Sequence, residues 1–391
     1  MMKRLVLGIT SPGSGPLIKG QAAYFKGLGY EVFLMAPSGE KITKYCEEEG
    51  CTHVPIDIVR TIQPLKDLLA FVQIVRELRK IKPDIVNVGT PKMGLLGMLA
   101  AAFIGVRTRI YTCRGFRYEH EKGLKRTVLI VMEKISSACA HMVICISNSV
   151  RERGVSDGIF SEDTSTLIGH GSSNGIDLDF FSPAEVMLDD VLALKESLGI
   201  QGKFVYGFVG RILDRKGIQE LYQAFLEVYK QDNESVLILV GGITEDQLSD
   251  KTLLQKFKDH PGIHWVGFQQ NVPLYMRIFD VFVLPAWWEG FGNVLIQAAA
   301  MGIPVVSTDG TGCRDAVHAG FNGLLVPVKN VPALTEAMQV YRLDPELRLR
   351  HGDNGKAWSK NFPSETIWGG LQELYQTLRE KKNSSYQKLT V

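Results

Sequence analysis

The sequence has no long apolar run, no excess of charge of one sign and no paired cysteines. No window holds eighteen uninterrupted apolar residues, so we expect no transmembrane helix. The formal net charge is only +2 over 391 residues, which argues against wholesale nucleic-acid binding. The six cysteines form no CxxC pair, which argues against a zinc site and suits free thiols in a reducing cytoplasm. The opening "MMKRLVLGIT" has too short an apolar part for a signal peptide and predicts a first strand.

Short apolar segments alternate with amphipathic ones along the whole chain. This alternation is typical of βαβ units and predicts an α/β protein with parallel sheets. Expected helices in the first half span 18–28, 66–81, 92–104 and 124–138. Expected strands span 4–9, 31–36, 84–89, 108–113, 141–146, 203–210, 235–242, 262–267, 280–285, 303–308 and 322–327.

The pattern breaks once, near residue 182, and then starts again. We therefore predict an N-terminal Rossmann-like domain over 1–182, a linker over 183–202 and a second Rossmann-like domain over 203–363. Residues 364–391 are expected to form a C-terminal helix and tail that cross back to the first domain. Two doubly wound domains would face each other with the carboxyl ends of their strands across a cleft, where such sheets bind ligands.

The stretch "AWWEGFGNVLIQAAAMG" should carry a binding site. It follows a buried strand, and its second part has the composition of a helix that ends at Gly302. The backbone N–H groups of Gly292, Asn293 and Val294 would then be unpaired donors at a helix start. Such groups form an anion site, which suits a diphosphate.

Two polar side chains flank this predicted anion site. Glu289 precedes it, and a carboxylate suits a sugar because it accepts short hydrogen bonds from neighbouring hydroxyls. Gln297 lies about two turns into the helix, where it could reach a ribose. Phe291 belongs to the same turn. The alternative is a surface loop with an incidental glutamate.

A second anion site is predicted in "FVGRILDRKGIQEL". Gly210 and Arg211 follow a strand, and Lys216 precedes the next helix. Arginine offers a planar fork for phosphate oxygens and lysine a mobile charge, which together suit a departing diphosphate. The alternative is a solvated charge cluster, to which we assign Arg215.

The loop after the first strand, "ITSPGSGPLIKGQ", is glycine-rich but lacks a dinucleotide signature. Gly15 would let the backbone approach a ligand closely. The glycines do not form GxGxxG, and the second strand ends "FLMAP" without an acid for an adenosine ribose. A nicotinamide-binding Rossmann domain is therefore a weak interpretation.

Taken together, these motifs make the chain resemble a family 4 glycosyltransferase with the GT-B fold of two facing Rossmann-like domains. The resemblance spans nearly the whole chain. It rests on "TPKMGLLG" (90–97), "YTCRGFRYE" (111–119), "SSNGID" (172–177), "GRILDRKG" (210–217), "EGFGNVLIQAAAMGIPVVSTDGTG" (289–312) and "NGLLVP" (322–327). The first two stretches look most like enzymes that build bacterial capsule or O-antigen units on a lipid carrier.

The resemblance implies a retaining hexosyltransferase that moves a hexose or N-acetylhexosamine from a nucleotide-diphosphate sugar, UDP by preference, to a polyprenyl-diphosphate-linked glycan. No metal or other cofactor is expected. Arg211 and Lys216 would hold the diphosphate and Glu289 the sugar, with the base near Gly267. Retention would follow from front-face displacement, in which the leaving phosphate oxygen takes the acceptor's proton.

This chain departs from the family pattern at two positions. Gln297 stands where relatives usually have a second acid for the ribose, so a charged hydrogen bond becomes a neutral one. Arg114 stands where many relatives have a histidine, and arginine cannot act as a base at neutral pH. We interpret Arg114 as stabilising phosphate charge or orienting the acceptor, with Arg117 and Glu119 also on the acceptor side; a surface arginine is the alternative.

The segment 118–137 raises the possibility of peripheral membrane contact on the inner face of the plasma membrane. It carries Lys122, Lys125 and Arg126 beside apolar residues, which would suit an anionic leaflet. The alternative is a core-facing helix with a solvated start.

Two other functions stay open. A sugar-nucleotide 2-epimerase shares the fold and needs no acceptor. A catalytically silent sugar-nucleotide-binding protein is the other alternative, which the departures at Gln297 and Arg114 keep open.

Overall fold

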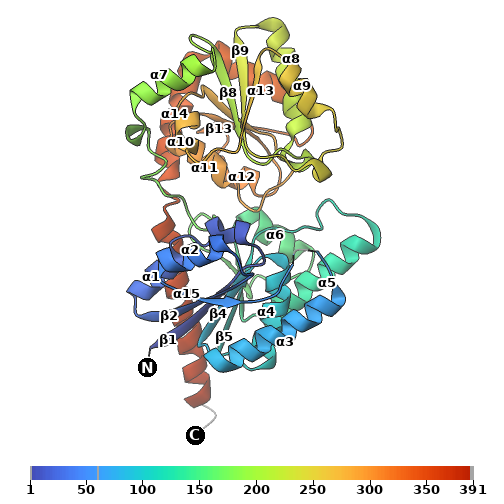
Figure 1. The fold of residues 1–391 in the computed structure, drawn as a ribbon, viewed down its shortest axis with the longest axis vertical. Coiled ribbons are helices and arrows are strands. Elements are labelled where there is room, and N and C mark those ends of the chain that lie inside the picture. Colours follow the sequence, from blue (N-terminus) through green and yellow to red (C-terminus); the bar gives the residue numbers. More distant parts are fainter. Residues whose placement is uncertain (1, 60, 388–391) are drawn as a thin grey trace. The chain divides into compact units, whose positions relative to one another are not determined.

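Parallel strands and covering helices build two units in the computed structural model, which describes residues 2–59 and 61–387 (Figure 1). The first unit runs to Gly175 and resumes at Ser364, and the second is Ile176–Pro363. Residues 183–202, expected as a linker, lie inside the second unit and contain helix α7 (Leu188–Ser197).

A seven-stranded parallel sheet forms the centre of the first unit, in the order β3-β2-β1-β4-β5-β6-β7. The five predicted strands are all present. The two that were missed, β3 and β7, are the edge strands, of only four and three residues. The strands are β1 (Lys3–Gly8), β2 (Tyr30–Ala36), β3 (Thr52–Pro55), β4 (Ile85–Gly89), β5 (Thr108–Cys113), β6 (Met142–Cys145) and β7 (Ser165–Leu167).

Helices cover both faces of this sheet, which gives the first unit two core layers. On β1, Val6 packs with one set of helices, whereas Leu5 and Leu7 pack with the other. This follows from the alternation of side chains along a strand that is buried on both faces. The helical segments are η1 (Pro12–Leu17), α1 (Gln21–Gly27), α2 (Glu40–Glu49), α3 (Pro64–Ile81), α4 (Pro91–Phe103), α5 (Gly123–Cys139), α6 (Asn148–Ser156) and α15 (Ser364–Gln387).

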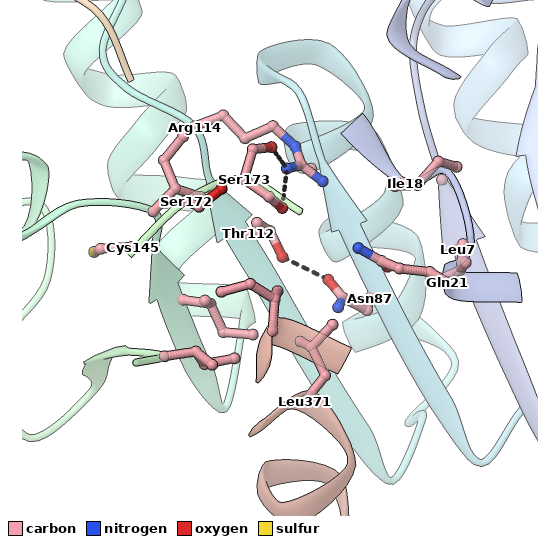
Figure 2. Close-up of a pocket in the computed structure, with 16 residues that line it drawn as sticks. Leu7, Ile18, Gln21, Asn87, Thr112, Arg114, Cys145, Ser172, Ser173 and Leu371 are labelled. Carbon is pink, nitrogen blue, oxygen red and sulfur yellow. Dashed lines mark hydrogen bonds between the residues drawn. The ribbon is translucent and has the colours of Figure 1, made fainter. Parts of the chain in front are cut away.

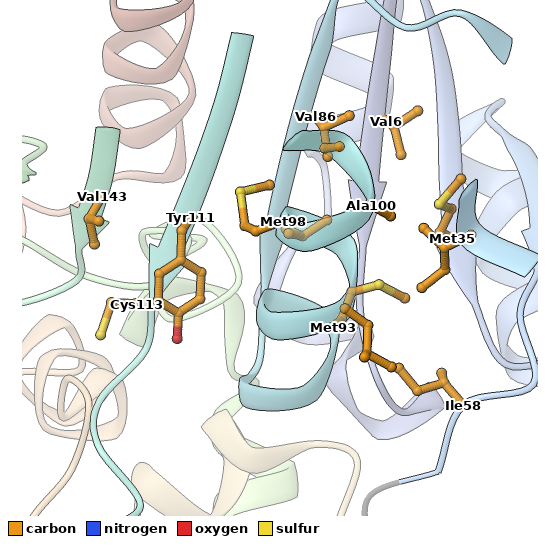
Figure 3. Packing of buried hydrophobic residues seen from close by; sticks show 14 of the residues in the cluster. Val6, Met35, Ile58, Val86, Met93, Met98, Ala100, Tyr111, Cys113 and Val143 are labelled. Atoms are coloured by element: carbon orange, nitrogen blue, oxygen red, sulfur yellow. The ribbon is translucent and has the colours of Figure 1, made fainter. Parts of the chain in front are cut away.

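Helix α4 is buried because its sequence is apolar on nearly every side. It packs against β4 and β5 and lies between α3 and α5. Figure 3 shows its residues Met93 and Met98 against the sheet residues Val86 and Tyr111. A helix with no polar face is stable only in such an enclosed position. The described helices include none that is long and apolar enough to cross a bilayer.

The C-terminal helix α15 returns to the first unit, as predicted. Tyr375 is fully buried there, and its hydroxyl accepts a hydrogen bond from Asn87 Nδ2 at 2.7 Å. Its ring stacks on Phe25 of α1, with the ring centroids 5.2 Å apart. Trp368 donates from its indole nitrogen to Asn174 Oδ1 at 3.0 Å. Asn174 belongs to the "SSNGID" motif and also bonds to Gln21 and Lys19, so this motif joins α15 to the start of α1.

The second unit has a six-stranded parallel sheet in the order β10-β9-β8-β11-β12-β13, and every strand was predicted. Its central strands are continuous apolar runs because helices cover both faces. The strands are β8 (Phe204–Val209), β9 (Ser235–Val240), β10 (Ile263–Gly267), β11 (Val281–Leu284), β12 (Val305–Thr308) and β13 (Gly323–Val326). The helical segments beside α7 are η2 (Pro183–Glu185), η3 (Asp214–Lys216), α8 (Ile218–Gln231), η4 (Glu245–Gln247), α9 (Leu253–Asp259), α10 (Val272–Met276), α11 (Asn293–Ala300), α12 (Cys313–Ala316), α13 (Val331–Leu343) and α14 (Pro345–Ser359).

Each sheet has one point where the strand order reverses. In the first unit it lies between β1 and β4, and in the second between β8 and β11. At such a point the loops leave neighbouring strands in opposite directions and open a crevice at the carboxyl edge, where doubly wound sheets bind ligands. The topology thus predicts one ligand-binding position in each unit.

The core of the first unit contains one buried acid with an unusual proton affinity. Glu133 of α5 is 5% exposed and accepts a hydrogen bond from the Tyr111 hydroxyl at 2.7 Å. Burial raises its pKa from the ordinary 4.5 to about 7, although the Tyr111 hydrogen bond favours the ionised form.

This acid should make stability depend on pH. Between about pH 4.5 and 7 the folded chain keeps the Glu133 proton while the unfolded chain loses it, so the free energy of unfolding falls as pH rises. The full effect is about 3 kcal/mol. Glu133→Gln should lack this fall, as measured by urea denaturation across that range. Parallel profiles for the variant and the natural chain would contradict the assignment.

Candidate functional site

Two loops meet at the switch point of the second unit. The loop after β8 carries Lys216 and Gly217, and the loop after β11 begins at Pro285. Gly217 has a positive φ of +70°, and a Cβ there would lie 1.9 Å from the Pro285 carbonyl oxygen. Only glycine allows this approach. The close packing fixes Lys216 beside the second loop.

An ion pair joins these loops. Lys216 Nζ contacts Glu289 Oε1, and the two side chains are 14% and 13% exposed. Arg215 NH1 lies 3.8 Å from Glu289 Oε2, and its guanidinium lies 4.7 Å from the Trp288 ring centroid. The interpretation of Arg215 as solvated charge is wrong, because its side chain is only 26% exposed and faces the site. Two cations around one carboxylate leave the group with net positive charge.

The start of α11 is less open than predicted. The Gly292 N–H donates to the Gly312 carbonyl at 3.1 Å, and the Asn293 N–H donates to the Phe291 carbonyl at 2.9 Å. The expectation of three unpaired donors is therefore wrong for two of them. The loop after β12 folds back so that the Gly312 carbonyl accepts the hydrogen bond of the Gly292 N–H. This contact joins residues far apart in the sequence, so local sequence could not predict it.

The remaining residues predicted for the donor lie in different surroundings. Gln297 is half-buried on α11, as is Val294 at its start, and Arg211 is exposed directly after Gly210. Gly267 ends β10 with a φ of +70°. The Phe291 ring is 7% exposed and packs on Phe362, so this ring belongs to the core.

Sequence reasoning gave no role to the loop of residues 309–312 or to Trp287. Thr311 accepts a hydrogen bond from the Glu289 N–H at 2.8 Å and so holds the acid in place. Trp287 donates to Glu220 Oε1 at 2.9 Å, and Lys329 Nζ lies 3.6 Å from the centroid of its ring. The segments "STDGTG" and "WW" were the features of the sequence that could have indicated these two roles.

In the first unit, the helix start that would bind a dinucleotide phosphate is already occupied. Glu49 of α2 accepts hydrogen bonds from the N–H groups of Gly20 at 2.5 Å and Ala23 at 3.1 Å. This carboxylate takes the place of an anion at the start of α1. Gly15 lies in η1, half-buried, before this capped start.

A polar cavity of about 20 Å³ lies at the switch point of the first unit, around the ends of β1, β4, β5 and β6 (Figure 2). That volume holds about one water-sized group. Gln21, Thr112 and Arg114 contribute polar side chains, and Leu371 of α15 contributes an apolar one. The other lining residues are Leu7, Gly8, Ile18, Asn87, Gly89, Ile144, Cys145, Ile146, Ile168, Ser172, Ser173 and Ile367.

Of the three residues predicted for the acceptor, only Arg114 lines this cavity. Its NH1 group donates to the Ser173 carbonyl at 3.2 Å and also contacts Ser173 Oγ. Burial lowers the pKa of Arg114 to about 10, so the guanidinium stays charged at neutral pH. Arg117 is exposed and Glu119 half-buried in the following loop.

Comparison with known proteins gives matches over nearly the whole chain. The family described as Glycosyltransferase Family 4 matches residues 13–180, and that described as Glycosyl transferases group 1 matches residues 191–358. The capsular polysaccharide biosynthesis glycosyltransferase CapM of Staphylococcus aureus is 34% identical over 94% of this chain and 96% of its own.

Two further similarities are more distant. The UDP-Gal:alpha-D-GlcNAc-diphosphoundecaprenol alpha-1,3-galactosyltransferase of Escherichia coli is 25% identical, over 79% of each chain. The crystal structure of HepE of Anabaena in complex with UDP superposes with a TM-score of 0.80, at 21% identity, and covers 96% of this chain and all of HepE. At that identity the superposition shows the fold alone.

Proposed function

The chain belongs to glycosyltransferase family 4, and from this premise we propose that it moves a hexose or N-acetylhexosamine from a UDP-sugar to a polyprenyl-diphosphate-linked glycan. The names of two relatives support the pathway and the acceptor: one is a capsular polysaccharide enzyme and the other acts on a diphosphoundecaprenol sugar. UDP is supported by that second name and by the HepE complex.

The observation that carries the proposal is the positively charged group at the switch point of the second unit. Lys216 and Arg215 surround Glu289 where the fold class binds nucleotide ligands, and Arg211 lies on the same loop as Lys216. A diphosphate at this edge would replace Glu289 as the partner of Lys216. The released carboxylate could then accept hydrogen bonds from two sugar hydroxyls.

We propose a front-face displacement with retention. The bond between the sugar's C1 and the diphosphate oxygen breaks while Arg211 and Lys216 stabilise the charge on the leaving group. The acceptor hydroxyl attacks C1 from the same face, and its proton passes to the leaving phosphate oxygen. The Cys313 thiol lies near Glu289, but burial raises its pKa to about 12, so it stays protonated and is a poor nucleophile.

Metal independence is part of the proposal. Among residues 2–59 and 61–387, no three His, Cys, Asp or Glu side chains gather as a ligand set. The cations of Arg211 and Lys216 would supply the charge that a metal gives to diphosphate chemistry elsewhere. Turnover should therefore persist in EDTA.

Gln297 would contact the donor's ribose through its amide. An amide offers one acceptor and adds donors, so the contact survives without its charge. The difference from a carboxylate is about 1 kcal/mol. We therefore propose that glutamine at position 297, in place of the acid of relatives, weakens donor binding without abolishing it.

Transfer assays with UDP-sugars and a prenyl-diphosphate-linked acceptor test the function. Lys216→Ala and Glu289→Ala should each lower kcat by about 10²- to 10³-fold, because each removes a group placed for transition-state charge or sugar orientation. Lys203→Ala is a matched control, since Lys203 pairs with Glu234 at 2.7 Å in the same unit at the start of β8, away from its carboxyl end.

The same assay separates the alternatives. A new sugar formed from UDP-N-acetylglucosamine without acceptor would show an epimerase. UDP binding without turnover of any donor would show a silent binding protein. Variants as active as the natural chain would contradict the assigned site.

We also propose that the first unit contacts the cytoplasmic face of the membrane. Helix α5 does not bury its whole apolar stripe: Leu124 is 80% exposed and lies beside Lys122 and Lys125. Helix α3 has a second stripe, at the spacing of one helix face, which sequence reasoning missed. Exposed apolar stripes beside basic residues suit an anionic leaflet. The α3 stripe comprises Leu65, Leu68, Leu69 and Val72, which are 56–80% exposed.

Flotation with phosphatidylglycerol vesicles tests this contact. The natural chain should float with the vesicles, and Leu65→Ser/Leu69→Ser should float several-fold less, because apolar contact area is lost. Leu188→Ser/Leu192→Ser removes two exposed leucines from α7 of the second unit and should change nothing. A natural chain that stays at the bottom of the gradient would contradict the proposal.

A further inference from the structure

Arg114 is half-buried and carries a charge that no acid neutralises. Within the described parts of the chain, no carboxylate forms an ion pair with it. Its hydrogen-bond acceptors are the carbonyl and hydroxyl oxygens of Ser173, both neutral, and its buried Nε has no hydrogen-bond partner. A guanidinium in this state costs folding free energy.

The sheet leaves space for this guanidinium. At the end of β4, a Cβ on Gly89 would lie 2.8 Å from Arg114 Nε and 3.0 Å from the Thr112 carbonyl oxygen. A larger residue at position 89 would push the guanidinium out of its place. Glycine here keeps the charge at the switch point between β1 and β4, over the carboxyl ends of the strands.

The cavity beside the guanidinium has neutral walls. Thr112 Oγ1 donates to Asn87 Oδ1 at 2.8 Å, and Asn87 Nδ2 donates to Tyr375, so these groups are already bonded to one another. Figure 2 shows Arg114 and Gln21 approaching the same space from opposite sides. A site with one cation, neutral walls and room for about one oxygen atom favours an anionic oxygen over a water molecule or a hydroxyl.

We propose that Arg114 binds an anionic phosphate oxygen of a diphosphate ligand in this cavity. The proposal rests on the proposed function, which brings two such ligands to the protein: the prenyl-diphosphate acceptor and the nucleotide donor. Their phosphate oxygens share the chemistry that the cavity recognises. Arg114 differs from a histidine at this position because its charge stays fixed at neutral pH.

Calorimetric titrations with farnesyl diphosphate, farnesol and UDP test this binding. Arg114→Gln should weaken binding of at least one of the two diphosphates by tenfold or more, and Arg114→Lys by less, since the charge is kept but the fork is lost. Farnesol binding should not change. The diphosphate that is affected identifies the source of the oxygen.

A melting temperature separates ligand binding from a structural role. Because Arg114→Gln removes an unpaired charge whose Nε is shielded from water without a partner, it should melt no lower than the natural chain. Arg109 lies on β5, the strand that ends just before Arg114, and is the matched control, because it donates to the carbonyls of Cys139 at 2.6 Å and Val106 at 3.0 Å. Arg109→Gln should melt lower and bind both diphosphates normally.

Two results would overturn the inference. One is unchanged binding of both diphosphates by Arg114→Gln, and the other is a loss of binding that only accompanies a lower melting temperature. If the natural chain still binds UDP and transfers sugar when either result is found, the proposed function stands and only the role of Arg114 fails. A natural chain that binds neither diphosphate would overturn both.

Discussion

The ion pair between Lys216 and Glu289 is the interaction on which the proposed chemistry depends. It exists because β8 and β11 are neighbours whose chains leave in opposite directions, and because Gly217 lets one loop press against the end of the other strand. The pair holds a cation and a carboxylate in place before substrate arrives. A diphosphate sugar would exchange this one contact for two, one to its phosphate and one to its hydroxyls.

The same topology is used differently in the first unit. There the start of α1 is closed by Glu49, so the phosphate position of a dinucleotide-binding domain is filled by the protein itself. The nearby cation is instead Arg114, directly after β5, which lies two strands from β1 in the sheet. The two units thus differ at their switch points: the second has cations around an acid, and the first has a half-buried arginine with no acid beside it.

Sequence periodicity was enough for the central strands, because strands buried on both faces are short, continuous apolar runs. It failed for β3 and β7, which are edge strands of only four and three residues, and for α7, which was taken as linker. Local sequence also singled out Lys216 and Glu289, which the structure brings together in an ion pair. It could not show that Gly312 folds back to pair with the start of α11, or that Arg215 turns inward over Trp288, since these contacts join distant segments.

The chain belongs to a glycosyltransferase family, and the switch point of the second unit is the place where we propose that the donor binds. We propose that the diphosphate of an activated sugar lies between the loops after β8 and β11. A crystal structure of the chain with a UDP-sugar tests it most directly. The account predicts phosphate oxygens beside Lys216 Nζ, with the Glu289 carboxylate on the sugar hydroxyls. An unchanged Lys216–Glu289 pair, with the nucleotide sugar bound elsewhere, would contradict it.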